Sequence, residues 1–168
     1  QSEEKDVFLK RIDPEINFDW VRNSSGKPIS EDAFTANWTG YIEAPHAGKY
    51  VFEAEVDDAI RVWINGELII DKWGETSSAA ASGNVMSNLD YSLEKGETQL
   101  KANVKYAIKV EYYEAILNAR ARLLWSSDKM QRQIVPQAQL FTTKDQPIGN
   151  GLNAVYQSKA IWICYTQK

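Results

Sequence analysis

Two adjacent carboxylates, Asp57 and Asp58, are the residues of this sequence best placed to do chemistry. Side chains that are neighbours on an ordinary strand point to opposite faces, so adjacent carboxylates on such a strand cannot share one ligand. A cis peptide bond would bring both carboxylates to one side, and a bound cation would hold that backbone conformation. Calcium fits best, because it prefers six to eight hard oxygen ligands in a flexible arrangement.

A solvated turn is the alternative interpretation of the same pair. Asp is common in turns because its side chain bonds the nearby backbone, and the dipeptide alone favours this alternative. The same pair gives little support for catalysis. A glycosidase needs two carboxyl groups about 5 Å or about 6.5–9.5 Å apart across a sugar, which two adjacent carboxylates on one metal do not provide. The sequence also lacks a Ser-His-Asp set, a phosphate-binding loop and zinc-ligand spacing, so we expect no enzyme.

The elements that must position the pair are short strands. Residues 50–56 alternate between apolar and polar, which predicts a strand with one buried face and a wet face that carries Glu53 and Glu55. Residues 60–70 contain two apolar runs around Asn65-Gly66, a tight-turn dipeptide, and therefore predict a β-hairpin. The carboxylate pair falls between these two elements.

The remaining pattern is also mostly that of strands. Residues 106–112 place Tyr106, Ile108, Val110 and Tyr112 on one face, and we expect residues 121–125 to pair with this strand. Residues 93–98 predict a turn around Gly96. Helix is scarce, with a single turn expected at residues 30–34.

Composition agrees with one all-β domain. The chain has 168 residues, enough for one full core, and it is rich in large side chains that fill β cores, with six Trp, eight Tyr and five Phe. Its net charge of −4 argues against a nucleic-acid or anionic-membrane partner. The longest apolar stretches fall far below the roughly 20 residues of a membrane span, so we expect no membrane insertion. The fold class predicted is an antiparallel β-sandwich or barrel.

Several motifs, in order and in register, resemble the protective antigen fourteen family. They are residues 11–20 (RIDPEINFDW), 34–42 (FTANWTGYI), 44–52 (APHAGKYVF), 56–66 (VDDAIRVWING) and 70–73 (IDKW), followed by 108–114 (IKVEYYE) and 121–125 (ARLLW). The resemblance covers about residues 8–141. It implies a β-sandwich of the kind found in bacterial toxins, glycosidase insertions, yeast flocculins and other adhesins, and extracellular polysaccharide sensors.

The resemblance also implies a site. In flocculin-like members an adjacent Asp pair, joined by a cis peptide bond, binds calcium that holds sugar hydroxyls, and Asp57 and Asp58 match that pair. Asn118 is the nearest candidate for a further calcium ligand from a late loop. Two departures are Ala59, where Gly is usual, and an Ile-Leu-bearing loop at residues 115–119 in place of a Gly-rich one. From its place after the hairpin, Trp73 is the tryptophan expected to contact a ligand.

The expected domain spans residues 1–141, and residues 142–168 form a tail. Residues 151–156 (GLNAVY) resemble the strand with which family members usually open, yet they lie near the other end of this chain. We expect them to complete a sheet, either within the chain or in a neighbour, where strand exchange would give a homodimer.

The function predicted is a non-catalytic, calcium-dependent carbohydrate-binding module of an extracellular or cell-surface bacterial protein. The parent protein would be an adhesin, a polysaccharide sensor or a glycosidase, and the partner an extracellular glycan. The alternative is a structural spacer or protein-interaction module that binds no sugar, since a fold does not fix a function.

Overall fold

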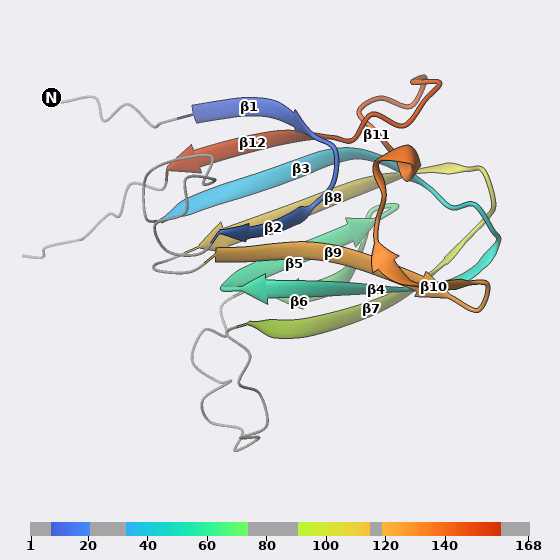
Figure 1. Cartoon of the computed structure of the whole chain (residues 1–168), viewed down its shortest axis with the longest axis horizontal. Helices are drawn as coiled ribbons and strands as arrows, with labels where there is room; N and C mark the ends of the chain where they lie inside the picture. The colour runs from blue at the N-terminus through green and yellow to red at the C-terminus, as the bar shows by residue number, and fades with distance from the viewer. Residues whose placement is uncertain (1–7, 21–32, 74–90, 115–118, 159–168) are drawn as a thin grey trace, which may run out of the picture.

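The computed structural model describes residues 8–20, 33–73, 91–114 and 119–158, and in these ranges the chain forms two packed antiparallel sheets (Figure 1). The larger sheet has seven strands, with the order β1 (Phe8–Asp13), β12 (Leu152–Ser158), β3 (Phe34–Glu43), β8 (Lys105–Glu114), β5 (Ala59–Ile64) and β6 (Glu67–Lys72), and with β11 (Leu140–Phe141) paired to β3. The smaller sheet has the order β10 (Met130–Ile134), β9 (Ala119–Ser127), β4 (Gly48–Asp57) and β7 (Ser92–Leu100), with β2 (Asn17–Trp20) paired to β9. The predicted antiparallel β-sandwich with little helix is confirmed, because the described helical structure amounts to one 3-10 turn, Gln137–Gln139.

The predicted strand at residues 50–56 and the predicted hairpin are confirmed as β4 and as β5 with β6. Asn65 and Gly66 form the turn with φ of 52° and 77°, the left-handed region that a tight hairpin turn requires. In β5 the residues Ile60, Val62 and Ile64 are buried, while Arg61 and Trp63 on the other face are half-buried. The strand therefore keeps one face in the core and turns the other outward.

The turn predicted at residues 93–98 is wrong, because these residues lie inside strand β7, which pairs with β4 over its whole length. Gly96 serves a close approach instead of a turn. A Cβ atom at this position would lie 2.1 Å from the carbonyl oxygen of Ile69 in β6, so the two sheets touch here at their edges. In the sequence, a glycine between charged residues indicated a turn. In the structure, this position is glycine because a side chain would collide with the backbone of Ile69.

Two further expectations changed. Residues 121–125 were expected to pair with residues 106–112, but β9 pairs with β4, β10 and β2 in the other sheet. Strand β8 cannot accept β9, because β3 and β5 occupy both of its edges. The helical turn expected at residues 30–34 falls mostly outside the described residues, and Phe34 begins strand β3.

Aromatic rings fill the space between the sheets. The fully buried large side chains include Trp38, Tyr112, Tyr156 and Phe34 from the seven-stranded sheet, and Trp125, Tyr50 and Phe52 from the other. Trp20 contacts Phe34 edge to face at 5.6 Å between ring centroids, and the ring centroid of Tyr50 lies 5.1 Å from that of Trp125. Packing of this kind stabilises beyond the burial of area alone. The core therefore agrees with the aromatic-rich composition.

Strand β12 lies between β1 and β3, paired on both edges within its own chain. The segment GLNAVY thus completes the seven-stranded sheet from a position late in the sequence. Asp13 of β1 fastens this region: it is 3% exposed and accepts hydrogen bonds from Trp38 Nε1 at 2.8 Å, from Arg11 Nε at 2.6 Å and from the Tyr156 hydroxyl. One carboxylate therefore joins β1, β3 and β12.

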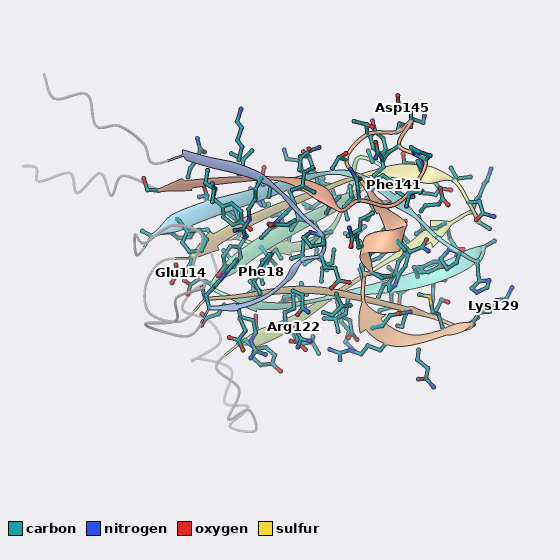
Figure 2. The ribbon with its side chains drawn as sticks, turned by 45° about the horizontal axis from the view of Figure 1, so that its top comes forward. Phe18, Glu114, Arg122, Lys129, Phe141 and Asp145 are labelled. Carbon is teal, nitrogen blue, oxygen red and sulfur yellow. The ribbon has the colours of Figure 1, made fainter. Side chains whose placement is uncertain are left out.

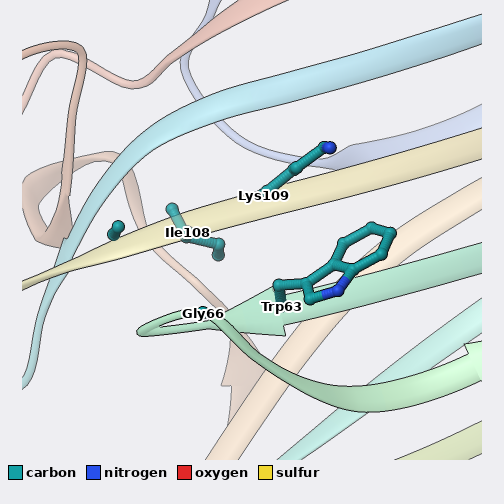
Figure 3. A pocket seen from close by; sticks show the side chains of 5 residues that line it. Trp63, Gly66, Ile108 and Lys109 are labelled. Atoms are coloured by element: carbon teal, nitrogen blue, oxygen red, sulfur yellow. The ribbon is translucent and has the colours of Figure 1, made fainter.

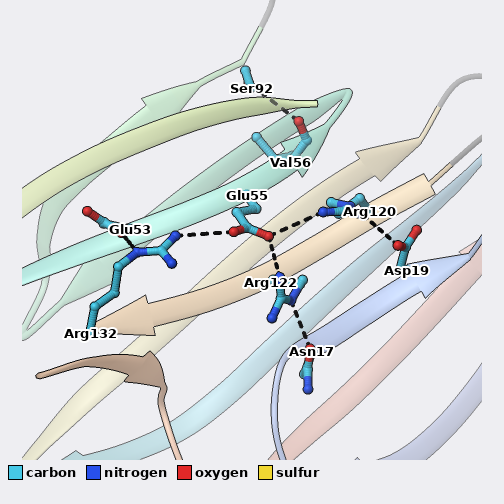
Figure 4. Close-up of polar contacts among 9 residues, drawn as sticks. All are labelled: Asn17, Asp19, Glu53, Glu55, Val56, Ser92, Arg120, Arg122 and Arg132. Carbon is cyan, nitrogen blue, oxygen red and sulfur yellow. Dashed lines mark hydrogen bonds and ion pairs between the residues drawn. The ribbon is translucent and has the colours of Figure 1, made fainter. Parts of the chain in front are cut away.

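The outer face of the five-stranded sheet was expected to be wet at Glu53 and Glu55, but arginines cover both (Figure 4). Glu53 is 6% exposed and Glu55 is 4% exposed. Arg132 bonds both carboxylates, reaching Glu55 at 3.1 Å, and Arg122 bonds Glu55 at 2.6 Å. Alternation along β4 located these glutamates on the outer face, but it could not reveal a layer of arginine from β9 and β10 above them.

Substituting Gly96 with alanine is expected to lower the free energy of unfolding by about 1–3 kcal/mol, because the new methyl group must displace the backbone of Ile69. Urea unfolding followed by tryptophan fluorescence measures the change. Glu97→Ala is the matched control. It truncates an exposed neighbour on the same strand, and we expect a change within about 0.5 kcal/mol. Equal stability of Gly96→Ala and the unmodified protein would contradict the close approach.

Stability is also expected to depend on the ionisation of Glu53. Burial alone raises the pKa of Glu53, but hydrogen bonds from Arg132 and Lys95 outweigh it and hold the pKa below the ordinary 4.5. The contribution of Glu53 is therefore present above pH 4.5 and is lost as the pH falls through the lowered value. Urea unfolding across this range is expected to show Glu53→Gln less stable than the unmodified protein at neutral pH, with the difference vanishing in acid. A constant difference would contradict this assignment.

Candidate functional site

The Asp57–Asp58 pair lies where the chain passes from one sheet to the other. Strand β4 of the five-stranded sheet ends at Asp57, and strand β5 of the seven-stranded sheet begins at Ala59, so Asp58 alone separates them. The peptide bond between the two aspartates is cis, as the family resemblance implied. Both carboxyl groups therefore sit at one end of the sandwich, on the edge between its layers.

The two carboxyl groups are close enough to form a hydrogen bond with each other. Burial raises the pKa of Asp57, and the charge of Asp58 and this hydrogen bond raise it further, to about 7. Two carboxylates in such contact do not both carry full charge unless a proton or a cation compensates one of them. The pair is therefore a place where a cation would be favoured electrostatically.

Neighbouring groups add to the negative potential. Glu114 at the end of β8 is fully buried, and its charge raises the pKa of Asp57, whereas the ammonium of Lys72 lowers it. Figure 2 shows Glu114 at the end of the molecule opposite Asp145. The Tyr112 hydroxyl donates to the backbone oxygen of Asp57 at 2.5 Å and so fixes the end of β4 against β8. The charges of Asp58 and Glu114 thus act on Asp57 against that of Lys72.

The protein atoms described here do not complete a metal site by themselves. Within the described ranges, no three or more His, Cys, Asp or Glu side chains are grouped so that they could hold a metal ion. Calcium also accepts amide, backbone carbonyl and water oxygens, so two carboxylates can form part of a calcium site. Asn118, the further ligand expected from sequence, lies outside the described residues.

Trp73, the expected ligand contact, follows the end of β6 and joins a small aromatic wall. Its ring centroid lies 6.4 Å from that of Tyr113, and the guanidinium of Arg61 lies 4.9 Å from the Trp73 centroid. Tyr113 stands opposite Ala59 in the pairing of β5 with β8, which places the wall one residue from the Asp pair. Asn65 lies at the far end of β5, so the structure does not bring it to the site.

A model of the PA14 domain family matches residues 2–139. The chain belongs to the PA14 domain family. The match confirms the resemblance drawn from the motifs around the Asp pair. In the described residues of this PA14 domain, no helix is long and apolar enough to cross a membrane.

Two relatives of this PA14 domain are anti-sigma factor proteins. It is 36% identical over 154 residues to the anti-sigma-I factor RsgI3 of Acetivibrio thermocellus, a match that covers 89% of this chain and 22% of that protein. It is 34% identical to a solved anti-sigma factor domain-containing protein from Clostridium clariflavum, with a TM-score of 0.66, covering 82% of this chain and 42% of that one. The chain thus spans only about a fifth of the curated relative.

A third likeness concerns the fold. The epithelial adhesin 6 A domain of Candida glabrata, solved in complex with Galβ1-3GlcNAc, is 18% identical, with a TM-score of 0.56 and coverage of 83% of this chain and 69% of that one. That protein binds a disaccharide on the same fold. At this identity the likeness shows the fold alone.

Sequence reasoning missed three residues of the site, namely Tyr112 as a hydrogen-bond donor, Glu114 and Lys72. A signal for Glu114 existed. Residues 106, 108, 110 and 112 alternate inward, and Glu114 continues that face into the core. A glutamate at an inward position at a strand end indicates a buried charge that needs compensation. Nothing in the local sequence marked Lys72, because its proximity to Asp57 arises from the arrangement of the strands.

Removing the Tyr112 hydroxyl as Tyr112→Phe is expected to lower the free energy of unfolding by about 1 kcal/mol, because the buried backbone oxygen of Asp57 loses its donor while the ring stays packed. Urea unfolding measures the difference. Tyr41→Phe on the outer face of β3 is the control, with an expected change within about 0.5 kcal/mol. If both variants match the unmodified protein, the hydroxyl does not fix the end of β4.

Proposed function

We propose that this PA14 domain recognises an extracellular glycan through a calcium ion held by Asp57 and Asp58, and that it is the sensing module of a longer regulator related to anti-sigma factors. The proposal is carried by the carboxyl pair at the junction of the sheets, where the pKa of Asp57 is raised to about 7. A cation relieves the repulsion that causes this shift. The similarity to anti-sigma factors favours a sensor over an adhesin or a glycosidase-associated module as the parent protein.

Each residue has a separate part in this proposal. Asp57 and Asp58 supply carboxylate ligands, and Asn118 supplies an amide oxygen. Calcium would hold sugar hydroxyls, which are hard oxygen ligands of the type that it prefers. Trp73 and Tyr113 would pack against the apolar face of the sugar ring, since Tyr113 stands opposite Ala59, the residue after Asp58, and the Trp73 ring lies 6.4 Å from that of Tyr113. No residue is assigned a catalytic role.

The alternative is a spacer or protein-interaction module that uses the same fold without sugar. In that case the Asp pair would share a proton, and calcium would not bind. The two readings differ in a simple observable, because a ligand that binds only the native state must stabilise that state.

Calcium is expected to raise the Tm relative to a chelator such as EDTA. At a hundredfold excess over the dissociation constant, the stabilisation is about 2.7 kcal/mol, or about 5–10 °C for a domain of this size. Differential scanning calorimetry at pH 8 measures it, and Asp58→Asn is expected to remove the shift. Asp145→Asn, an exposed carboxylate at the other end of the sandwich, is the control and should retain the shift.

A glycan array, read with calcium and with EDTA, provides the second half of this test. Calcium-dependent binding that Asp58→Asn abolishes is the expected result. A Tm that calcium leaves unchanged would contradict the metal site and favour the spacer, and calcium stabilisation without binding of any glycan would contradict the sugar-binding part of the proposal.

A further inference from the structure

A strip of aromatic and charged side chains runs along the outer face of the seven-stranded sheet, away from the Asp pair. We call it the outer strip, and it consists of Trp73, Arg61, Glu111, Trp63 and Lys109. Arg61 and Trp63 alternate with buried residues of β5, so they face outward. The pairing of β5 with β8 places Arg61 opposite Glu111 and Trp63 opposite Lys109. Arg61 joins this group to the wall at Trp73, with its guanidinium 4.9 Å from that ring centroid.

A pocket of about 300 Å³ lies at the far end of the outer strip (Figure 3). Trp63 and Lys109 line it together with Gly66, Ala107 and Ile108. Gly66 has no side chain and Ala107 only a methyl group, so nothing fills the space beside the indole of Trp63. The hollow is therefore a consequence of small residues placed next to a large ring.

The polar groups beside this indole form a donor and acceptor pair. Lys109 Nζ lies 4.9 Å from the Trp63 ring centroid and 3.1 Å from Glu111 Oε1. The Lys109 side chain is 52% exposed, so this ion pair contributes little to stability and can rearrange at small cost. An indole face flanked by an ammonium and a carboxylate suits a sugar ring, because the C–H face packs on the ring while hydroxyls bond the charged groups.

The surroundings favour a sugar over a protein segment. In the pairing of β3 with β8, Thr39 stands opposite Lys109, and Asn37 stands opposite Glu111. Both face outward, since Trp38 between them is buried. On the β3 side, hydroxyl and amide groups therefore continue the strip where a protein interface core would have apolar side chains, and the apolar neighbour on the β6 side is Leu68 opposite Trp63. The pocket volume is also at the scale of a small-ligand site.

The distance along β5 between the Asp pair and Trp63 determines what length of glycan can contact both. Ala59, next to the Asp pair, and Trp63 are four residues apart on β5, which corresponds to about 13 Å along an extended strand. One sugar ring bound at the Asp pair cannot span this distance, whereas a chain of several sugars can. Trp73 and Arg61 lie between the two ends and continue the contact surface.

We propose that the ligand is an extended polysaccharide that runs from the Asp pair along the outer strip and stacks one of its sugars on Trp63. This inference rests on the proposed glycan-binding function and adds that affinity depends on the length of the glycan. Affinity therefore increases with the number of sugar units until the chain reaches Trp63.

Isothermal titration calorimetry in calcium tests the proposal, with cello-, xylo-, manno- and galacturono-oligosaccharides of two to six units as probes. In the series that binds, we expect affinity to rise with length, and Trp63→Ala to weaken binding of the longest member by about tenfold while leaving the disaccharide unchanged. Trp63→Phe keeps a smaller ring in place and is expected to lose less. Ile148→Ala, which truncates an exposed side chain outside the outer strip, is the control and should bind as the unmodified protein does.

The outcomes separate this inference from the proposed function. Affinity that does not depend on length, or a longest member bound equally by Trp63→Ala and the unmodified protein, overturns the outer strip and leaves the Asp-pair site intact. The calcium-dependent Tm shift of Trp63→Ala is measured in parallel to show that this variant is folded. If the shift is lost, the affinity of Trp63→Phe for the longest member replaces that of Trp63→Ala as the test. Failure to bind any probe, together with a Tm insensitive to calcium, contradicts the proposed function itself.

Discussion

The passage of the chain from one sheet to the other through a single residue is the constraint on which this structure depends. Strand β4 belongs to one layer and β5 to the other, and Asp58 alone connects them. A connection this short must lie at the rim of the sandwich, where the two sheets come together. Asp57 and Asp58 are half-buried there, the Tyr112 hydroxyl bonds the backbone oxygen of Asp57, and the charge of Glu114 acts on the Asp57 carboxyl group. The chemistry of the Asp pair follows from this connection.

The two outer faces of the sandwich differ in what covers them. On the five-stranded sheet, Glu53 and Glu55 are closed off by arginines from β9 and β10, so their charges are compensated within the protein. On the seven-stranded sheet, Trp63 and Lys109 leave a hollow beside Gly66. A face whose polar groups already satisfy each other offers little to a ligand, whereas a ring with a hollow beside it does. The difference favours the seven-stranded sheet as the binding face.

The fold class, the hairpin around Asn65-Gly66 and the strand before Asp57 could be predicted from sequence, because each depends on a local period or turn preference. The cis bond at Asp57–Asp58 was implied by the resemblance to the family, whereas the dipeptide alone favoured a solvated turn. What could not be predicted depends on contacts between distant segments. The turn predicted at Gly96 was wrong because Ile69, the residue that needs the missing side chain, lies in the other sheet and is not marked by the local sequence. The wet face predicted at Glu53 was wrong because Arg132, which covers it, lies far along the chain. Periodicity assigns a side chain to a face but does not identify what covers that face.

The position of β12 in the sheet order has a consequence for how the domain forms. Strand β1 pairs only with β12 among the described strands of its sheet, and β12 in turn links it to β3. Nearly the whole chain separates Phe8 from its partner Gln157, so this pairing closes a very long loop. Among the described strands β1 precedes and β12 follows all the others along the chain, so the hydrogen bond from the Tyr156 hydroxyl to Asp13 forms only after β12 has been synthesised. Because the entropy of closing this loop is lost before the strand contacts are gained, pairing of β1 with β12 is expected to slow the folding of the domain.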